Sequence, residues 1–477
     1  QMFMPGLYAP PPPLGELVAM LDRSDEGRLM LDYMNRDCLD LVERLYEHDK
    51  VKIHLLRLVS ENLQCPNELG TGMGVLLMPG IIHTYGVSQP VGGSGKLTQA
   101  LVRCLQHHGG ELRCNAEVAQ VLVSGGRASG VRLASGETIA AKDAVIGAIH
   151  PHVVRKFVQG VPEPVLQRAE RATLAPFSIM VSHYDLKEPC RYHAGEEVGY
   201  ATMLEFMATD RLDEMIADFD DIKRGLITER RLCAGGDESI GDRTRVPSGA
   251  GMFHGITFAP YQVKDARWAG RHWDEIKEEI GDLSLAHYRR FVSNLTDDNI
   301  IARTIVSPVD LERSSPNSMM RGDLHGVAPY FYQSAGHRPT PDLGQYTVPG
   351  VERLYLAGPF QHPGGGVYGA GRATAIKMFE ALGMDFGAVA AGVRHDGGVP
   401  ATIAAASAPG PTDGLVLRGA ADEELMRVEA LERVGDELVI KGKSFGTMPL
   451  QARLDAAGAR AGLKLLGWKK LAFLATL

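Results

Sequence analysis

The residues of this sequence that are best suited to chemistry are glycines gathered in one stretch, Arg353–Arg372. Five glycines stand between positions 364 and 371, after a segment that alternates like a β-strand and before one with helical periodicity. Glycine lets the backbone approach a ligand closely, and the free N-terminus of a helix presents unpaired N–H groups to negative charge. The stretch therefore predicts a strand, a loop and a helix that together bind an anion or an electron-rich ring.

Three of these glycines, Gly364, Gly366 and Gly369, also match the G-x-G-x-x-G pattern of a dinucleotide-binding loop. That loop opens a βαβ unit, with an acidic residue about 20 positions further on at the end of the second strand. Asp385 lies near this distance, but it follows the helix directly, with no strand between them. We therefore interpret the stretch as a cofactor loop of another kind. A glycine-rich turn without a ligand is the alternative, and the entropic cost of so many glycines argues against it.

Composition excludes several classes of function. The 50 basic and 58 acidic side chains give a net charge of −8, which argues against nucleic acid as a partner. No apolar run reaches the roughly 18 residues that cross a bilayer, and the histidines lack metal-binding spacing. Because the 6 cysteines form no C-x-x-C pair, we expect reduced thiols in a cytoplasmic protein without a metal ion. A chain that begins with Gln1 and shows no signal peptide is expected to have lost its native start.

The clearest strand pattern follows residue 89. The loop Gly92–Gly95 precedes a helix at 96–108, and both a ligand contact and a plain N-cap turn by Ser94 explain its glycines. Alternation then predicts a strand, a β-meander and a returning strand. These segments are Glu111–Cys114, Val118–Ser124, Ala128–Leu133, Thr138–Ala140 and Ala144–Ala148.

The end of the chain predicts an amphipathic helix at 450–475. Trp468 stands beside Lys469 and Lys470, with leucine and phenylalanine around them. Such a helix lies on a membrane surface or, more often, packs on its own protein or on a second subunit. Peripheral membrane contact therefore stays open.

Three motifs resemble one flavoprotein family. The segment Leu354–Arg372, LYLAGPFQHPGGGVYGAGR, closely resembles the C-terminal flavin motif of bacterial phytoene-desaturase-like proteins, a family that includes retinol saturase. The segment 90–101, with Gly109-Gly110 and 115–118, resembles the second flavin-domain segment of that family. Ser307–Arg313 with Gly322–His325 resembles part of its substrate domain. The matches cover about residues 1–385 in the family's order.

The resemblance implies an α/β fold: a flavin domain of the glutathione-reductase type, interrupted by a substrate domain of mixed sheet and helices. The implied order is a helical part of the substrate domain at 1–88, an FAD-domain segment with a β-meander at 89–150, the substrate domain at 151–330, the C-terminal FAD-domain segment at 331–385, a linker-like stretch at 386–414 and a C-terminal extension at 415–477.

The resemblance also implies which residues contact FAD. The helix near Gly369 would point its N-terminus at the flavin pyrimidine edge, where negative charge accumulates on reduction. The backbone at Val118 would meet the adenine. The implied cofactor-binding residues are Val118, Gly358, Pro359, Gly364, Gly365, Gly366, Val367, Gly369 and Ala370.

One departure from the family is large. Its members begin with a strand, a G-x-G-x-x-G loop and an acidic ribose ligand, and nothing before Gln89 has that form. We expect that this N-terminal unit was removed or left out, or that it is a separate chain that docks onto this one. Without it, FAD should be held weakly or not at all.

The resemblance implies hydride transfer between FAD and a carbon of an apolar, lipid-like substrate, with desaturation or saturation of a C–C bond. His362 and Tyr368 are the candidates for proton handling, and Tyr330, Tyr332 and His337 for the substrate pocket. A structural role is the alternative for each of them. Two other functions remain: a lipid-binding or escort protein without redox chemistry, and a regulatory subunit that completes another chain's site.

Overall fold

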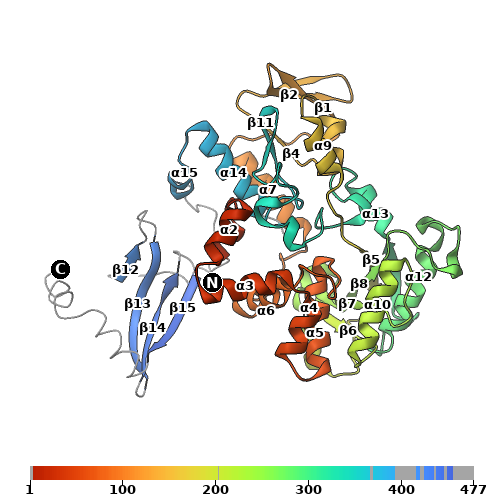
Figure 1. Cartoon of the computed structure of the whole chain (residues 1–477). Helices are drawn as coiled ribbons and strands as arrows, with labels where there is room; N and C mark the ends of the chain where they lie inside the picture. Colours follow the sequence, from red (N-terminus) through yellow and green to blue (C-terminus); the bar gives the residue numbers. More distant parts are fainter. Residues whose placement is uncertain are drawn as a thin grey trace. The chain divides into compact units, whose positions relative to one another are not determined.

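The computed structural model describes residues 4–201, 203–365, 369–392, 415–418, 424–434, 437–444 and 448–454. The chain divides into two compact units, Gln1–Val389 and Ala390–Leu477. The first unit contains two β-sheets, which Figure 1 shows as separate layers with helices around them. The mixed α/β class predicted from the sequence is therefore confirmed.

The first sheet has six strands and combines an antiparallel meander with a parallel pair. Its strands are β1 (Val118–Ser124), β2 (Arg127–Leu133), β3 (Thr138–Ala140), β4 (Val145–Gly147), β10 (Thr347–Val348) and β11 (Val351–Leu356). In the parallel pair β4 and β11, Leu356 lies beside Gly147. Strands from distant parts of the sequence therefore end at the same edge. Their apolar side chains share a buried core with helices α8 (Val154–Phe157) and α9 (Glu163–Glu170).

The second sheet has five strands in the order β6-β7-β8-β5-β9 and is covered by helices on both faces. Its strands are β5 (Ser178–Leu186), β6 (Leu204–Phe206), β7 (Cys233–Gly236), β8 (Gly251–Ala259) and β9 (Ile300–Val306). Side chains alternate along β5. Ile179 faces a core shared with α5 (Asp49–Val59) and α10 (Leu212–Arg224), whereas Met180 faces α12 (Trp273–Tyr288). We call this sheet and its helices the substrate lobe.

The other helices of the chain begin mostly at polar cap residues. The Ser24, Asp37 and Ser307 side chains each accept a hydrogen bond from a backbone N–H of the helix that follows. These helices are α1 (Met4–Leu7), α2 (Leu14–Leu21), α3 (Asp25–Asn35), α4 (Cys38–Leu45), α6 (Met73–Tyr85), α7 (Gly95–His107), α11 (Glu238–Gly241), α13 (Pro308–Ser314), α14 (Gly369–Leu382) and α15 (Phe386–Gly392). Ser94 makes no such bond at α7.

The predictions of local structure at 111–114 and at the start of 386–414 were wrong. Residues 111–114 form no strand, because among the described residues no strand lies beside them to pair with, and all four are exposed. The linker predicted at 386–414 begins with the helix α15, since the carboxylate of Asp385 accepts the N–H of Ala388 and Phe386 packs on Phe379. Residues 393–414 lie outside the described part.

The second unit contains a four-stranded antiparallel sheet. Its strands are β12 (Leu415–Arg418), β13 (Glu424–Val434), β14 (Glu437–Ser444) and β15 (Met448–Leu454). The helix predicted at 450–475 is therefore wrong for 450–454, where β15 pairs along β14. The rest of that segment lies outside the described residues. Within the part of the chain that is described, no helix has the length and apolar character needed to cross a bilayer.

Two buried histidines make the stability of the first unit depend on pH. Burial lowers the pKa of His150 to about 3 and that of His287 to about 4, from 6.5 for an unperturbed imidazole. Both are neutral in the folded protein and are protonated on unfolding in acid. Their stabilisation is therefore complete above about pH 6.5 and is lost as the pH falls. Between about pH 7.5 and pH 5, the free energy of unfolding should fall by about 4 kcal/mol through these two groups.

Urea unfolding at a series of pH values checks this prediction. His287→Gln keeps an N–H donor for the carbonyl of Phe206, which lies 2.6 Å from Nε2 of His287. The variant should lose about half of that pH dependence. The same pH dependence in variant and parent would contradict the assignment.

Candidate functional site

The candidate site lies where the parallel strands β4 and β11 end. The N–H of Ala357, the first residue after β11, donates to the carbonyl of Gly147 at the end of β4 (3.1 Å). The hydroxyl of Thr374 in α14 donates to the carbonyl of Leu356 (3.0 Å) and so ties that helix to the end of β11. In open α/β sheets, ligands bind at the carboxyl ends of the parallel strands. Residues 357–365, which follow β11 and are here called the glycine loop, occupy this position.

Two side chains from other parts of the chain leave no room for side chains on the glycine loop. A Cβ atom at Gly364 would lie 2.6 Å from the guanidinium of Arg338, and one at Gly365 would lie 2.2 Å from Nδ1 of His325. Both glycines also have positive φ angles, +86° and +30°. Close approach and backbone conformation together require glycine at both positions.

Arg338 joins the glycine loop to the segment 325–328. One of its terminal nitrogens, Nη2, donates to the carbonyls of His325 (2.8 Å), Val327 (3.0 Å) and Pro359 (3.0 Å). The other, Nη1, donates to the carbonyl of Ala328 (3.3 Å). The side chain is buried and forms no ion pair with any described residue, and burial lowers its pKa to about 10. A guanidinium that spans four carbonyls sets the position of the loop relative to this segment.

His325 is the second side chain that packs against the glycine loop. Its Nε2 lies 3.2 Å from the carbonyl of Glu61, and its backbone N–H donates to the carboxylate of Asp323 (2.8 Å). Burial is the main cause that lowers its pKa, and the charge of Arg338 adds to the effect, while Asp323 opposes it. His325 is therefore a neutral imidazole at neutral pH, held between the substrate lobe and the glycine loop.

The predicted catalytic residue His362 is bound to the N-terminal segment. Its Nε2 lies 2.8 Å from the carbonyl of Gly6, and its own carbonyl accepts the hydroxyl of Tyr346 (3.1 Å). Burial lowers its pKa. Arg372 in α14 also donates to the carbonyl of Tyr8, so residues 6–8 lie against the glycine loop. The structure thus gives His362 a positioning contact, and its role in proton handling stays a prediction.

The three residues predicted for the substrate pocket differ in exposure. Tyr330 is 7% exposed and donates its hydroxyl to the carboxylate of Glu68, which also pairs with Lys223. Tyr332 stacks on Tyr330 and is 57% exposed, and His337 is half-buried. Tyr330 and Tyr332 therefore lie together, but the hydroxyl of Tyr330 contacts a partly exposed ion pair, whereas Tyr332 is largely exposed to solvent.

The remaining predicted contacts fall at two places. Gly358, Pro359, Gly364 and Gly365 lie in the glycine loop, and Gly369 and Ala370 begin α14. Val118 lines a cavity of about 340 Å³ together with Gly147 and Ala148, at the carboxyl end of β4. The predicted residues Gly366, Val367 and Tyr368 lie outside the described residues.

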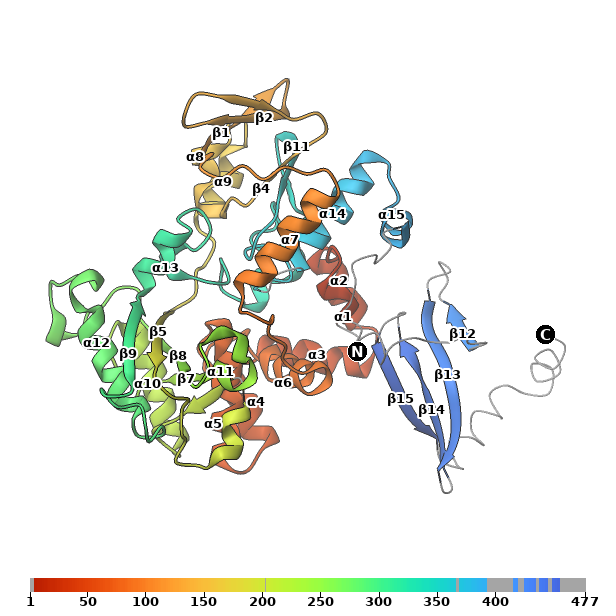
Figure 2. The same ribbon diagram turned by 180° about the vertical axis from the view of Figure 1, so that it is seen from behind.

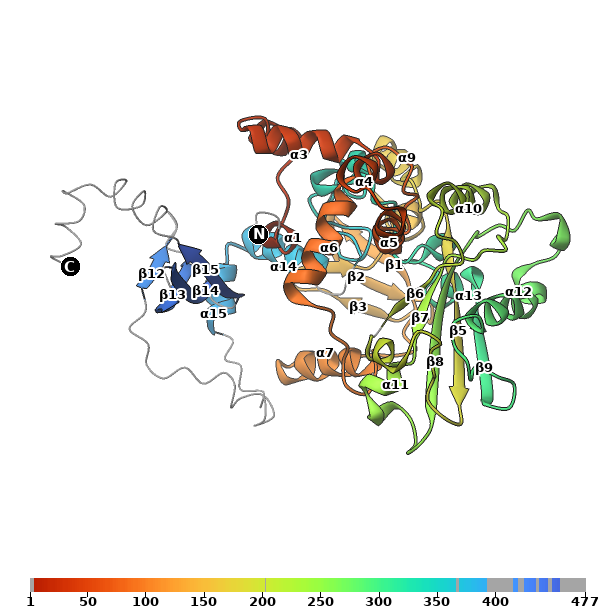
Figure 3. The same cartoon turned by 90° about the horizontal axis from the view of Figure 1, so that it is seen from below.

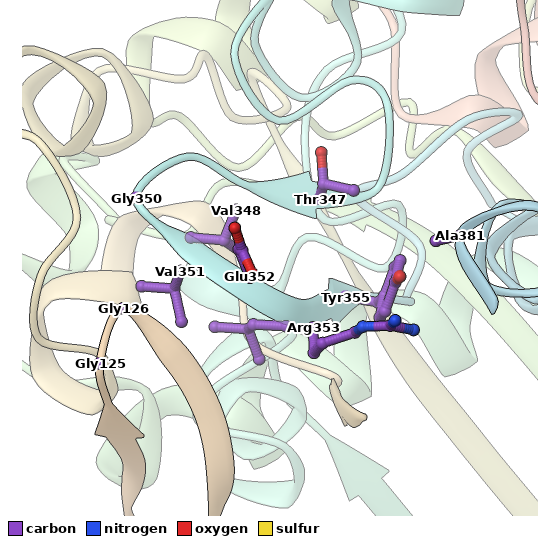
Figure 4. A pocket seen from close by; sticks show the side chains of 11 residues that line it. Gly125, Gly126, Thr347, Val348, Gly350, Val351, Glu352, Arg353, Tyr355 and Ala381 are labelled. Carbon is purple, nitrogen blue, oxygen red and sulfur yellow. The ribbon is translucent and has the colours of Figure 1, made fainter. Parts of the chain in front are cut away.

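A larger cavity, of about 600 Å³, lies at the other end of β11. Figure 4 shows it between the turn at Gly125 and Gly126, the strands β10 and β11, and Ala381 of α14, with Arg353 and Thr347 on its wall. It contains none of the predicted site residues. Because ligands of parallel sheets bind at the carboxyl ends of the strands, we assign the site to the glycine loop rather than to this cavity.

The glycine loop fits a flavin ring on evidence of its own. Gln361 is fully buried within it, yet both polar atoms of its carboxamide lack a partner, and Nε of Arg338 also has none. Buried polar atoms without partners are rare and call for a missing partner. Together with glycines that exclude side chains, they describe a cradle prepared for a polar, planar group.

Sequence reasoning missed Arg338 and His325 as site residues. His325 is the last residue of a motif that resembles part of the substrate domain. Arg338 directly follows His337, which is a predicted residue of the substrate pocket. Arg338 stands 26 positions before Gly364 and 27 before Gly365, and no local pattern links them. A cation next to proline in an apolar, aromatic segment was the only available signal.

Known proteins resemble this chain in sequence and in structure. No protein-family model matches the chain. It is 27% identical over 310 residues to pyridine nucleotide-disulfide oxidoreductase domain-containing protein 2 of Rattus norvegicus, over 61% of this chain and 51% of that protein. It is 24% identical over 320 residues to the lycopene-forming phytoene desaturase of Pantoea ananas, over 66% of this chain and 61% of that protein. The chain thus spans about half to three fifths of the length of these curated relatives.

Among solved structures, an oxidoreductase from Methanosarcina mazei aligns over 77% of this chain and 75% of its own, with 12% identity and a TM-score of 0.48. A likeness at that level adds nothing to the assignment. The described fold is of the α/β class. The sequence relatives then confirm, at the level of the family, the predicted resemblance to the phytoene desaturases and the prediction of FAD as the cofactor.

Gly365→Ala tests whether the glycine loop binds the flavin. The added methyl group meets Nδ1 of His325 and an unfavourable φ, so we expect a cost of about 1–3 kcal/mol in the loop and flavin retention at least about tenfold lower. Gly371→Ala is the matched control, because nothing lies within 4 Å of its added Cβ in α14. The flavin-to-protein ratio of the complete protein after gel filtration gives the result. Normal flavin content in Gly365→Ala would place the cofactor elsewhere.

Proposed function

We propose that this chain is the larger part of an FAD-dependent oxidoreductase that transfers a hydride between FAD and a carbon atom of an apolar, lipid-like substrate. The observation that carries the proposal is the glycine loop at the carboxyl ends of β4 and β11, supported by Arg338 and His325. A loop that excludes side chains over a buried cation suits a ring that becomes negatively charged on reduction. The chemistry of hydride transfer comes from FAD when it is bound.

The residues of this chain would bind and orient the reactants. The glycine loop and the start of α14 would hold the ring, with the positive end of the helix dipole near it. Arg338 would add a positive charge that water does not screen, because the side chain is buried. The contacts of residues 6–8 with His362 and Arg372 would help to exclude water from the loop.

Support for the substrate class comes from the relatives. The lycopene-forming desaturase of Pantoea ananas acts on phytoene by its name. We therefore propose an isoprenoid or another lipid-like molecule whose C–C bond is desaturated or saturated. Tyr332, which is exposed at the surface, remains a candidate for contact with this substrate.

We further propose that a βαβ unit carrying a G-x-G-x-x-G loop docks on this chain, either as a segment of a longer polypeptide or as a separate chain. The helix α7 supports this, because none of its side chains is buried by the described residues. Leu101 and Leu105 lie one helical turn apart and are each 47% exposed. Figure 2 shows α7 at the front of the first unit, and Figure 3 shows it at the edge of that unit, away from α14. An amphipathic helix gains most of its stability by burying such a stripe.

The free edge of β4 supports the same proposal. Among the described strands, β4 pairs only with β11, and Ile146 in it is 55% exposed. Parallel sheets are normally covered on both faces, and an unpaired edge is a template for another strand. A parallel strand beside β4 would also lie along the cavity that Val118 lines.

Leu101→Glu combined with Leu105→Glu tests the docking surface. Both leucines are exposed in the chain described here, so its own stability should change little. In the complete protein, the loss of two buried leucines should weaken docking of the βαβ unit by at least about a hundredfold and release FAD. Leu29→Glu in α3, at a leucine that is 52% exposed, is the control and should retain FAD. Equal FAD content in all three proteins would contradict the proposed surface.

The function itself is tested on the protein isolated from its source. The visible spectrum and intact mass should show bound flavin together with a nucleotide-binding segment or a second polypeptide. Anaerobic addition of phytoene as the probe should bleach the oxidised flavin if the reaction is a desaturation. A colourless protein that binds a prenyl lipid would overturn the redox proposal in favour of a lipid-binding or escort role. A protein that binds flavin only as part of another chain's site would favour the role of a regulatory subunit.

A further inference from the structure

His325 lies at the contact between the substrate lobe and the glycine loop. Its imidazole is held from the substrate lobe by the carbonyl of Glu61, the central residue of a short 3-10 turn after α5. Its backbone is fixed by Asp323, whose other carboxylate oxygen accepts the N–H of Ala175 (2.8 Å) just before β5. On the far side, the ring meets Gly365 of the loop. His362, in contrast, is held by Gly6 of the N-terminal segment.

The contacts of His325 determine which ring nitrogen carries the proton. A carbonyl oxygen only accepts hydrogen bonds, so Nε2, which faces Glu61, must be the N–H donor. In a neutral imidazole the other nitrogen then has a free lone pair. Nδ1 is the atom that a Cβ at Gly365 would approach to 2.2 Å, and no described residue donates a hydrogen bond to it. The structure therefore directs an unprotonated basic nitrogen at the glycine loop.

The groups around His325 act in opposite directions on its protonation. Burial and the guanidinium of Arg338 favour the neutral ring, while Asp323 and Glu61 favour the protonated ring. A new negative charge near Nδ1 would favour the protonated ring, as Asp323 and Glu61 do. An opposite charge at short range favours the charged form of a titratable group, and burial strengthens that interaction.

We propose that His325 takes up a proton at Nδ1 when FAD bound at the glycine loop is reduced, and releases it on reoxidation. This role rests on the function proposed above. It completes the balance of a dehydrogenation: one hydrogen leaves a CH–CH unit with its electron pair as a hydride to FAD. The other leaves as a proton that His325 binds, and the electron pair of that C–H bond becomes the C=C bond. The substrate loses two electrons and the cofactor gains two.

The test needs no identified substrate. The FAD-loaded complete protein is titrated with dithionite, and the midpoint potential is measured between about pH 6 and about pH 8, where histidine changes charge. With His325 as acceptor, the slope should correspond to two protons for two electrons. His325→Gln keeps an N–H donor for the carbonyl of Glu61 but has no basic nitrogen, so its slope should fall to half, one proton for two electrons. His193→Gln, an exposed imidazole of the substrate lobe, should keep the slope of the parent protein.

Each outcome decides the proposal. A parent protein that takes up one proton overturns it even if His325→Gln fails to fold. A slope of two protons in both the parent and His325→Gln overturns it by assigning the proton to another group. If the isolated complete protein holds no flavin, both this role and the proposed function are wrong, whereas a flavin-loaded protein with a slope of one proton leaves the proposed function standing.

Discussion

The buried guanidinium of Arg338 is the interaction on which the candidate site depends. It donates to carbonyls at 325, 327, 328 and 359, and so joins the segment that follows the substrate lobe to the loop that follows β11. A buried charge is costly unless its hydrogen bonds are satisfied. Here backbone carbonyls, not a carboxylate, accept hydrogen bonds from both Nη atoms, while Nε has no partner. No ion pair with a described residue neutralises the positive charge, which remains available to a negative group at the loop.

This arrangement explains why the loop is so rich in glycine. Arg338 and His325 lie directly against two of its glycines and leave no room for a Cβ atom at either position. The parallel pair β4 and β11 then determines where the loop stands, because both strands end at the same edge. Strand, loop and helix position the site, and the two basic side chains give it its electrostatic character.

The sequence predicted the parts of this site that are encoded locally. Glycine spacing and alternation around Leu354 and Leu356 predicted the strand, the loop and the helix, and the structure has β11, the glycine loop and α14 there. It did not predict Arg338 or His325, since their contacts to the loop arise only from tertiary packing. The strand expected at 111–114 failed for a related reason: alternation describes a strand's faces, but a strand forms only beside a partner. At 450–454, apolar residues fitted a helix and a strand equally, and pairing with β14 decided the outcome.

The central claim is that the glycine loop holds a flavin ring, and a structure of the complete protein with FAD tests it most directly. The ring should lie against Gly364 and Gly365, with its pyrimidine edge toward the first turn of α14 and with Arg338 behind the loop. Density for the ring in the cavity beside Arg353 and Thr347, or anywhere away from the glycine loop, would contradict the account.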